Sequence, residues 1–134
     1  QPVVIRGPEE FEVAFSAMSK ERVGALVVQP LLTGGSLGLG RQVAELAAKH
    51  RLPAISDGVM FPEAGGLISY GADRVETRRR GAAFVDKILK GRKPADLPVE
   101  QPMKFELVIN LKAAKQIGLI IPQWTLMKAD KVIR

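Results

Sequence analysis

Short apolar runs alternate with amphipathic, helix-length segments along this chain, and that alternation limits the possible folds more than any other feature. The apolar run at residues 25–28 is typical of a strand covered on both faces in a parallel sheet. Further strands are predicted at residues 52–55, 66–69 and 104–109. Strands that alternate with helices favour a doubly wound, mostly parallel α/β sheet, in which ligands bind beyond the carboxyl ends of the strands.

Helices are predicted between these strands from their apolar faces. Pro8, Glu9 and Glu10 form a typical helix start, because proline fits the first turn and carboxylates suit the positive end of the helix dipole. The apolar face of the first helix consists of Phe11, Ala14, Phe15 and Met18. After a loop at residues 30–36, the second helix has an apolar face of Val43, Leu46 and Ala47.

The second half of the chain has clearer helix boundaries. A third helix is predicted at residues 73–89, with Gly91 as its left-handed cap. The proline-rich stretch at residues 94–102 indicates an extended connection. Asn110 fits the N-cap of a short helix at residues 111–117, which ends at Gly118 before Pro122 starts another turn.

The first five residues form an apolar run that is typical of a buried strand. The run has no initiator methionine and no signal-type segment, so we expect the chain to begin inside a longer protein.

Composition sets the class of protein. The chain has 134 residues, 46% of them apolar, and this is enough for one compact core. Apolar stretches such as residues 24–28 are far shorter than the ~20 residues of a membrane span, so a soluble domain is expected. The absence of cysteine excludes disulfides, thiolate metal sites and cysteine nucleophiles.

The formal net charge of +6 raises the question of nucleic-acid binding, and the excess sits mainly in residues 73–93. This segment has eight basic and three acidic residues, which gives +5. No aromatic residue interrupts the run Arg78, Arg79, Arg80, so the stacking surfaces of single-strand binders are missing. We therefore expect a solvated helix face, or one that faces another lobe, and no nucleic-acid partner.

Other chemical signals are weak. The glycine-rich stretch at residues 33–40 lies where phosphate-binding loops occur, but it lacks a Gly-Lys-Ser/Thr ending, and Val43 occupies the position where the dinucleotide fingerprint has Gly or Ala. His50, the only histidine, lies in a Lys-His-Arg run at a predicted helix end, where the helix dipole explains it. We predict no catalytic residues, no metal site and no cofactor.

Six segments carry a resemblance to a known family. They are residues 47–55, 63–71, 85–91, 96–102, 104–112 and 129–133. In order along nearly the whole chain, these segments resemble the ABC transporter substrate-binding protein family, which includes TrpX-like tryptophan-binding proteins. The resemblance implies the type I periplasmic-binding-protein fold, in which two α/β lobes joined by crossovers close on a small ligand.

Family chains are about twice as long as this one, so the resemblance implies that residues 1–134 are the C-terminal portion of a solute-binding protein. Residues 1–69 and 103–134 would form the second lobe, and residues 72–98 a crossover segment. The helix at residues 73–89 would pack on the missing first lobe. Without that lobe, we expect its apolar face to pack on another copy, to swap between protomers, or to meet the missing half supplied elsewhere.

Three strand ends are expected to face the cleft and to provide the ligand-binding residues. These residues are Pro30, Leu31, Thr33, Ser56, Asp57, Gly58, Tyr70 and Gly71. Asp57 either binds the amino group of an amino-acid ligand or caps the turn before Gly58. Tyr70 either stacks on or hydrogen-bonds to the solute, or packs at a hinge. The hydroxyls of Thr33 and Ser56 either contact the ligand or belong to ordinary loop residues.

The expected function is that of the solute-binding component of an ABC importer, not of an enzyme. A small organic solute, with an amino acid as one candidate, would bind between the lobes and be delivered to a membrane permease. The expected location is the periplasm, or outside the cytoplasmic membrane on a lipid anchor. The alternative is a ligand-sensing regulator domain with the same fold, which an N-terminal helix-turn-helix in the full gene would favour over a signal peptide.

Overall fold

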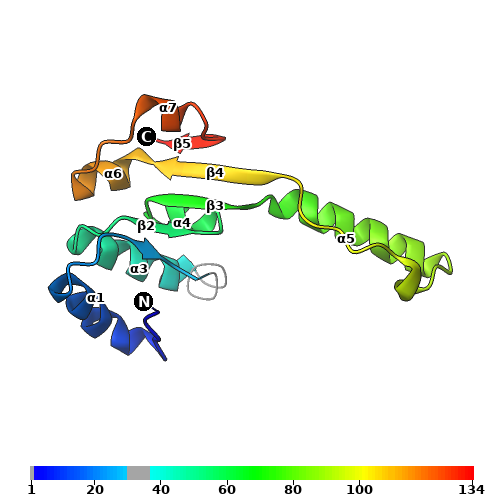
Figure 1. The fold of residues 1–134 in the computed structure, drawn as a ribbon, viewed down its shortest axis with the longest axis horizontal. Coiled ribbons are helices and arrows are strands. Elements are labelled where there is room, and N and C mark those ends of the chain that lie inside the picture. Colours follow the sequence, from blue (N-terminus) through cyan, green and yellow to red (C-terminus); the bar gives the residue numbers. More distant parts are fainter. Residues whose placement is uncertain (1, 30–36) are drawn as a thin grey trace. The chain divides into compact units, whose positions relative to one another are not determined.

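The computed structural model of the chain describes residues 2–29 and 37–134 (Figure 1). Within them, five strands form one sheet in the order β1-β2-β3-β4-β5. The strands are β1 (Leu26–Val27), β2 (Ala54–Ser56), β3 (Ile68–Ala72), β4 (Phe105–Asn110) and β5 (Lys131–Ile133). The chain divides into two compact units: unit 1 comprises Gln1–Gly71 and Glu106–Arg134, and unit 2 comprises Ala72–Phe105.

The sheet is mostly parallel, as the alternation of strands and helices predicted. β1 pairs with β2, β2 with β3, and β4 with β5, all in parallel. β4 runs antiparallel to β3. The N–H of Asn110, at the end of β4, donates to the Leu67 carbonyl just before β3 at 2.8 Å, and the N–H of Asp73, just after β3, donates to the Lys104 carbonyl at 2.9 Å. The α/β fold class is confirmed, with one antiparallel pairing in the sheet.

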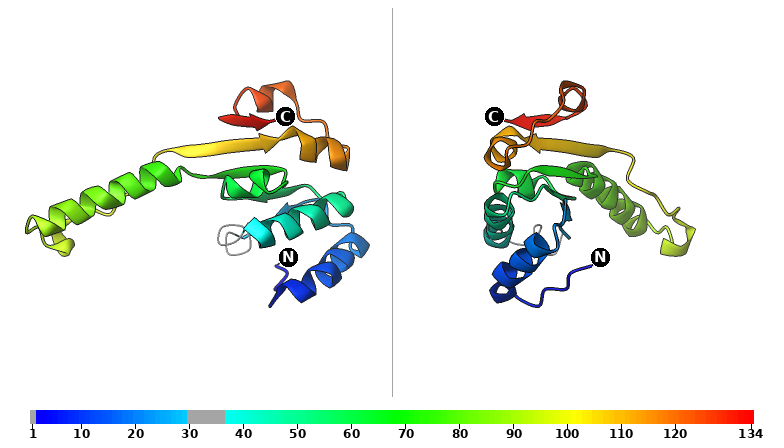
Figure 2. Two further views of the ribbon diagram at one scale, coloured as in Figure 1. Left: turned by 180° about the vertical axis from the view of Figure 1, so that it is seen from behind. Right: turned by 60° about the vertical axis from the view of Figure 1, so that its left-hand side comes forward.

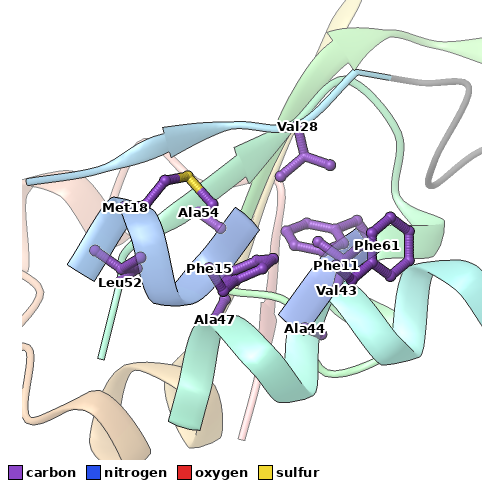
Figure 3. Packing of buried hydrophobic residues seen from close by; sticks show 10 residues of the cluster. All are labelled: Phe11, Phe15, Met18, Val28, Val43, Ala44, Ala47, Leu52, Ala54 and Phe61. Atoms are coloured by element: carbon purple, nitrogen blue, oxygen red, sulfur yellow. The ribbon is translucent and has the colours of Figure 1, made fainter. Parts of the chain in front are cut away.

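The main hydrophobic core of unit 1 lies between the sheet and the helices α1 (Phe11–Lys20) and α3 (Leu37–Lys49). A short 3-10 turn, η1 (Pro8–Glu10), precedes α1. The predicted apolar faces are the buried ones. Figure 3 shows ten of the buried side chains: Phe11, Phe15, Met18, Val28, Val43, Ala44, Ala47, Leu52, Ala54 and Phe61. In Figure 2, α1 and α3 pack side by side on the sheet.

The link from β2 to β3 contains a helix that the sequence pattern did not predict, α4 (Met60–Glu63). Its Phe61 is fully buried, and the ring packs against the backbone of Gly66, where an added Cβ would lie 2.5 Å from the ring. Gly65 has a φ of +105°, a conformation that favours glycine. The glycine pair therefore turns the chain tightly beneath Phe61 and returns it to the sheet.

The C-terminal part of unit 1 begins with α6 (Leu111–Ile117), whose predicted caps are both present. The Asn110 side chain accepts a hydrogen bond from the Ala113 N–H at 3.1 Å and donates one to the Pro62 carbonyl at 2.9 Å. Gly118 adopts the left-handed conformation at the other end. The turn expected after Pro122 is the helix α7 (Gln123–Leu126), and β5, which follows it, was not predicted.

Unit 2 consists mainly of the helix α5 (Arg74–Leu89) and the return connection that contains η2 (Pro94–Asp96). Asp73 caps α5, because its Oδ1 accepts hydrogen bonds from the N–H groups of Val75 and Glu76. Gly91 is left-handed, as predicted. No residue of unit 2 is buried, and the extended connection is tied to α5 by the ion pair between Arg80 and Glu100 at 2.9 Å.

Two expectations about strands are wrong. Residues 2–5 form no strand, and Val4 is 82% exposed, because no neighbouring strand pairs with this run among the described residues. Val27 is not covered on both faces: it is 85% exposed, so the described residues leave the face of β1 that carries it open. Among the described residues, no helix combines the length and the apolar character that a bilayer span would need.

Candidate functional site

The end of β2 and the residues of β3 aligned with it carry the same four-residue pattern side by side. Residues 55–58 read Ile-Ser-Asp-Gly, and residues 68–71 read Ile-Ser-Tyr-Gly. The parallel register pairs Ile55 with Ile68 and Ser56 with Ser69. Because β1 is parallel to β2, and the Val28 N–H donates to the Ile55 carbonyl at 2.8 Å, the end of β1 reaches the same edge of the sheet.

Both serines of this paired pattern are buried: Ser56 is the last residue of β2, and Ser69 is the second residue of β3. Ser56 was predicted as a ligand residue, whereas Ser69 was not. The Ser69 Oγ is buried without a hydrogen-bond partner among the described residues. Such an atom is costly to leave unpaired, so Ser69 is a polar group next to the predicted ligand residues whose hydrogen bonding the described residues leave open. The sequence signal for it is the Ile-Ser pair that occurs in both strands.

Asp57 follows β2 and is exposed. Among the described residues, its carboxylate forms no hydrogen bond or ion pair, so the alternative role as a turn cap has no bond to support it there. The turn itself is closed by backbone: the Phe61 N–H donates to the Gly58 carbonyl at 3.0 Å. The carboxylate is therefore held at the strand end by a turn that leaves it open to solvent.

Gly71 and Asp57 are in direct backbone contact. A Cβ added to Gly71 would lie 1.8 Å from the carbonyl oxygen of Asp57, which no side chain can satisfy. Gly71 therefore allows the end of β3 to approach the loop that carries Asp57. Tyr70, the residue between Ser69 and Gly71, is 54% exposed.

The structure thus brings five of the predicted ligand residues together at one edge of unit 1: Ser56, Asp57, Gly58, Tyr70 and Gly71. The other three, Pro30, Leu31 and Thr33, lie outside the described residues. Their contact with a ligand stays a prediction, as it does for the five.

A hollow lies on another part of unit 1, between α1 and α3. It has a volume of about 560 Å³ and is lined by Pro8, Glu9, Phe11, Glu12, Gln42, Glu45, Leu46 and Lys49. One of its three carboxylates, Glu12, is already paired with Lys49. Among the described residues, no cluster of His, Cys, Asp or Glu is arranged to hold a metal ion. The hollow contains none of the residues at the strand ends.

Comparison with known proteins places this architecture in a family. The family described as ABC transporter substrate binding protein matches residues 1–133. No curated protein sequence matches the chain.

Solved structures share the fold. One is the ABC domain in complex with L-Trp from Streptococcus pneumoniae, with 25% identity and a TM-score of 0.82 over 99% of this chain and 44% of that one. Another is a conserved domain protein from Vibrio cholerae, with 24% identity and a TM-score of 0.78 over 92% and 41%. The third is the ligand-free, open form of a substrate binding protein with adhesive properties from Clostridium difficile, with 19% identity and a TM-score of 0.68 over 97% and 42%.

The chain spans less than half the length of each of these structures. Its family match nevertheless extends along almost all of its own length, and its mostly parallel sheet is the one that these structures contain. The chain therefore belongs to the ABC transporter substrate-binding protein family.

Proposed function

We propose that the chain is the ligand-binding portion of an ABC importer's solute-binding protein, and that it holds a small organic solute without chemical change. The observation that carries the proposal is the paired Ile-Ser-x-Gly pattern, which brings Asp57, Tyr70 and two buried serines to one edge of the sheet. In α/β sheets, that edge is where ligands bind. Family membership supports a solute as the ligand.

An amino acid is the solute class that fits these side chains best. The exposed Asp57 carboxylate suits an ammonium group through a charge-assisted hydrogen bond, and the half-exposed Tyr70 ring suits an apolar or aromatic side chain. A structural relative with 25% identity was solved in complex with L-Trp, which supports the same class.

The domain arrangement is part of the proposal. Residues 1–69 and 103–134 would belong to the second lobe of a two-lobed protein, and residues 72–98 to the crossover. The apolar side chains of α5, among them Val75, Val85 and Leu89, are exposed and would pack on the first lobe. In the isolated chain, another copy would take that place, so the chain would self-associate through α5.

The location and the second partner follow from the family. ABC substrate-binding proteins act outside the cytoplasm, so we place this one in the periplasm or on a lipid anchor outside the cytoplasmic membrane. It would deliver its solute to a membrane permease after closing around it.

The test is isothermal titration of the full-length protein with L-tryptophan and with other amino acids, guided by native mass spectrometry of any co-purified solute. Asp57→Asn keeps the shape of the side chain and removes its charge, so it should weaken binding by about 1–3 kcal/mol. Glu45→Gln removes a charge from the distant α1–α3 hollow and serves as the matched control. Equal affinities for Asp57→Asn and the unmodified protein would contradict the assignment of Asp57, and binding of no amino acid would contradict the solute class.

A further inference from the structure

The helix α7 presents an apolar surface that the solute site does not use. Residues 122–129 form a tight helical coil, in which the Met127 N–H donates to the Gln123 carbonyl at 3.0 Å and the Lys128 N–H to the Thr125 carbonyl at 3.1 Å. Thr125 and Leu126 are half-buried, whereas the opposite side of the turn is exposed. We call this exposed surface the α7 face; it consists of Trp124 (64% exposed), Met127 (79%) and Lys128, which share one side of the turn by their spacing.

The α7 face lies in a strongly basic segment. Residues 111–134 contain five cations and one carboxylate, a net charge of +4, and one of these cations, Lys131, is paired with Glu63 at 3.0 Å. That carboxylate, Asp130, accepts a hydrogen bond from the Leu107 N–H at 2.8 Å. The ammonium of Lys128 lies 5.4 Å from the centre of the Trp124 ring, at cation–π distance, so the positive charge lies next to the largest apolar side chain of the face. The partner that complements this surface is apolar with negative charge at its edge.

A lipid surface has this combination. Tryptophan side chains prefer the boundary between lipid headgroups and hydrocarbon, and a long lysine places its charge among the headgroups while its stem lies on apolar atoms. Anionic lipids attract nearby cations. A stable protein interface needs roughly 800 Å² from each partner, more than one helical turn offers, whereas contact with lipid strengthens residue by residue.

We propose that the α7 face is a peripheral contact site for an anionic lipid surface. The contact is weak and reversible, since few side chains enter the lipid. It holds α7 against the membrane that carries the importer. The site goes beyond the proposed function, because it needs neither a bound solute nor Asp57.

The experiment measures binding of the full chain to vesicles of equimolar phosphatidylglycerol and phosphatidylcholine, and to vesicles of phosphatidylcholine alone. Trp124 is the only tryptophan in the sequence, so its fluorescence reports directly on the α7 face. The expected result is a blue shift of the emission and co-sedimentation with the anionic vesicles, both weakened by salt. Neutral vesicles should bind far less.

Two variants and two matched controls test whether the α7 face makes the contact with the vesicles. Lys128→Ala should weaken partitioning to anionic vesicles about fivefold, and Trp124→Ala should weaken it several-fold. Lys20→Ala and Val13→Ala remove an exposed cation and an exposed apolar side chain from α1 and should change nothing. All four positions are exposed, and circular dichroism checks that each variant is folded.

Three outcomes would overturn the proposal. They are an unshifted Trp124 emission with anionic vesicles, equal binding to neutral vesicles, and loss of binding in the α1 variants to the same extent as in the α7 variants. Protection of Trp124 from iodide quenching in the full-length protein without vesicles, measured as the difference from its Trp124→Phe variant, would overturn it as well, because the face would then be covered by protein. Failure of solute binding would leave the lipid result unchanged, so the two proposals are tested separately.

Discussion

The two units of this chain are held together by different interactions. Unit 1 buries a continuous apolar core that includes Phe11, Phe15 and Phe61. Unit 2 buries no residue, and its helix is fixed by the Asp73 cap and by ion pairs such as Arg80 with Glu100. Burial stabilises unit 1, whereas local hydrogen bonds and charges stabilise unit 2. Substitutions of the same kind should therefore have unequal effects in the two units.

The largest difference is expected for phenylalanine truncation. Phe61→Ala leaves a cavity in the core of unit 1 and should lower the free energy of unfolding by about 3–5 kcal/mol. Phe84→Ala removes a half-buried ring of unit 2 that contacts Lys87, and should cost about 1 kcal/mol. Denaturant unfolding measures both. Equal losses would mean that unit 2 depends on burial as much as unit 1 does. If Phe61→Ala does not fold, Phe61→Leu provides the smaller step.

Glycine-to-alanine substitutions should change stability in opposite directions in the two units. Gly71→Ala forces a methyl group against the Asp57 carbonyl and should destabilise unit 1 by about 1–3 kcal/mol. Gly81→Ala lies inside α5 with open space around it and should stabilise that helix by about 1 kcal/mol. Thermal unfolding with circular dichroism separates the two. A stable Gly71→Ala protein with unchanged solute affinity would show that the contact between Gly71 and Asp57 is not needed.

Polar interactions should also differ between the units. Asn110→Ala removes a buried side chain that both caps α6 and donates to the Pro62 carbonyl, and should cost about 1–3 kcal/mol. Glu100→Gln breaks an exposed ion pair with Arg80 and should cost about 1 kcal/mol or less, with the effect vanishing in high salt. A larger cost for Glu100→Gln in denaturant unfolding would reverse this comparison.

The smallest expected effect is that the stability of α5, in unit 2, depends on pH. The hydrogen bond from the Lys104 ammonium, followed by the backbone N–H of Glu76, holds the pKa of Asp73 below its ordinary value of 3.8. A lowered folded-state pKa gives a stabilisation that is complete above the ordinary value and is lost as the pH falls through the lowered one.

The control for this pH effect is Asp73→Asn, which keeps an acceptor for the α5 cap but cannot titrate. Helicity followed by circular dichroism during acid titration should fall further in the unmodified chain than in Asp73→Asn. Identical acid profiles would show that Asp73 does not stabilise α5 through its charge.

The sequence patterns predicted what depends on periodicity and capping. The apolar faces of α1 and α3, and the caps Gly91, Asn110 and Gly118, were recognised because each is a local signal. The helix α4 and the strand β5 were missed, since three or four residues are too few to show a period. Val27 and residues 2–5 were assigned wrongly, because the sequence alone does not reveal that one face of β1 is left open or that no strand pairs with residues 2–5 among the described residues.

The location of the candidate site was predicted from the sequence, but its internal contacts were not. The strand ends at Asp57 and Tyr70 follow from the position of ligands in α/β sheets. The burial of Ser69 and the contact between Gly71 and Asp57 depend on the register of β2 against β3, which no local pattern specifies.

The most direct test is a crystal structure of the full-length protein with its co-purified solute. The predicted result is a solute at the carboxyl ends of β2 and β3, within hydrogen-bond distance of the Asp57 carboxylate and in contact with Tyr70. A solute bound elsewhere, such as in the α1–α3 hollow beside Glu45, with both strand ends empty, would contradict the proposed function.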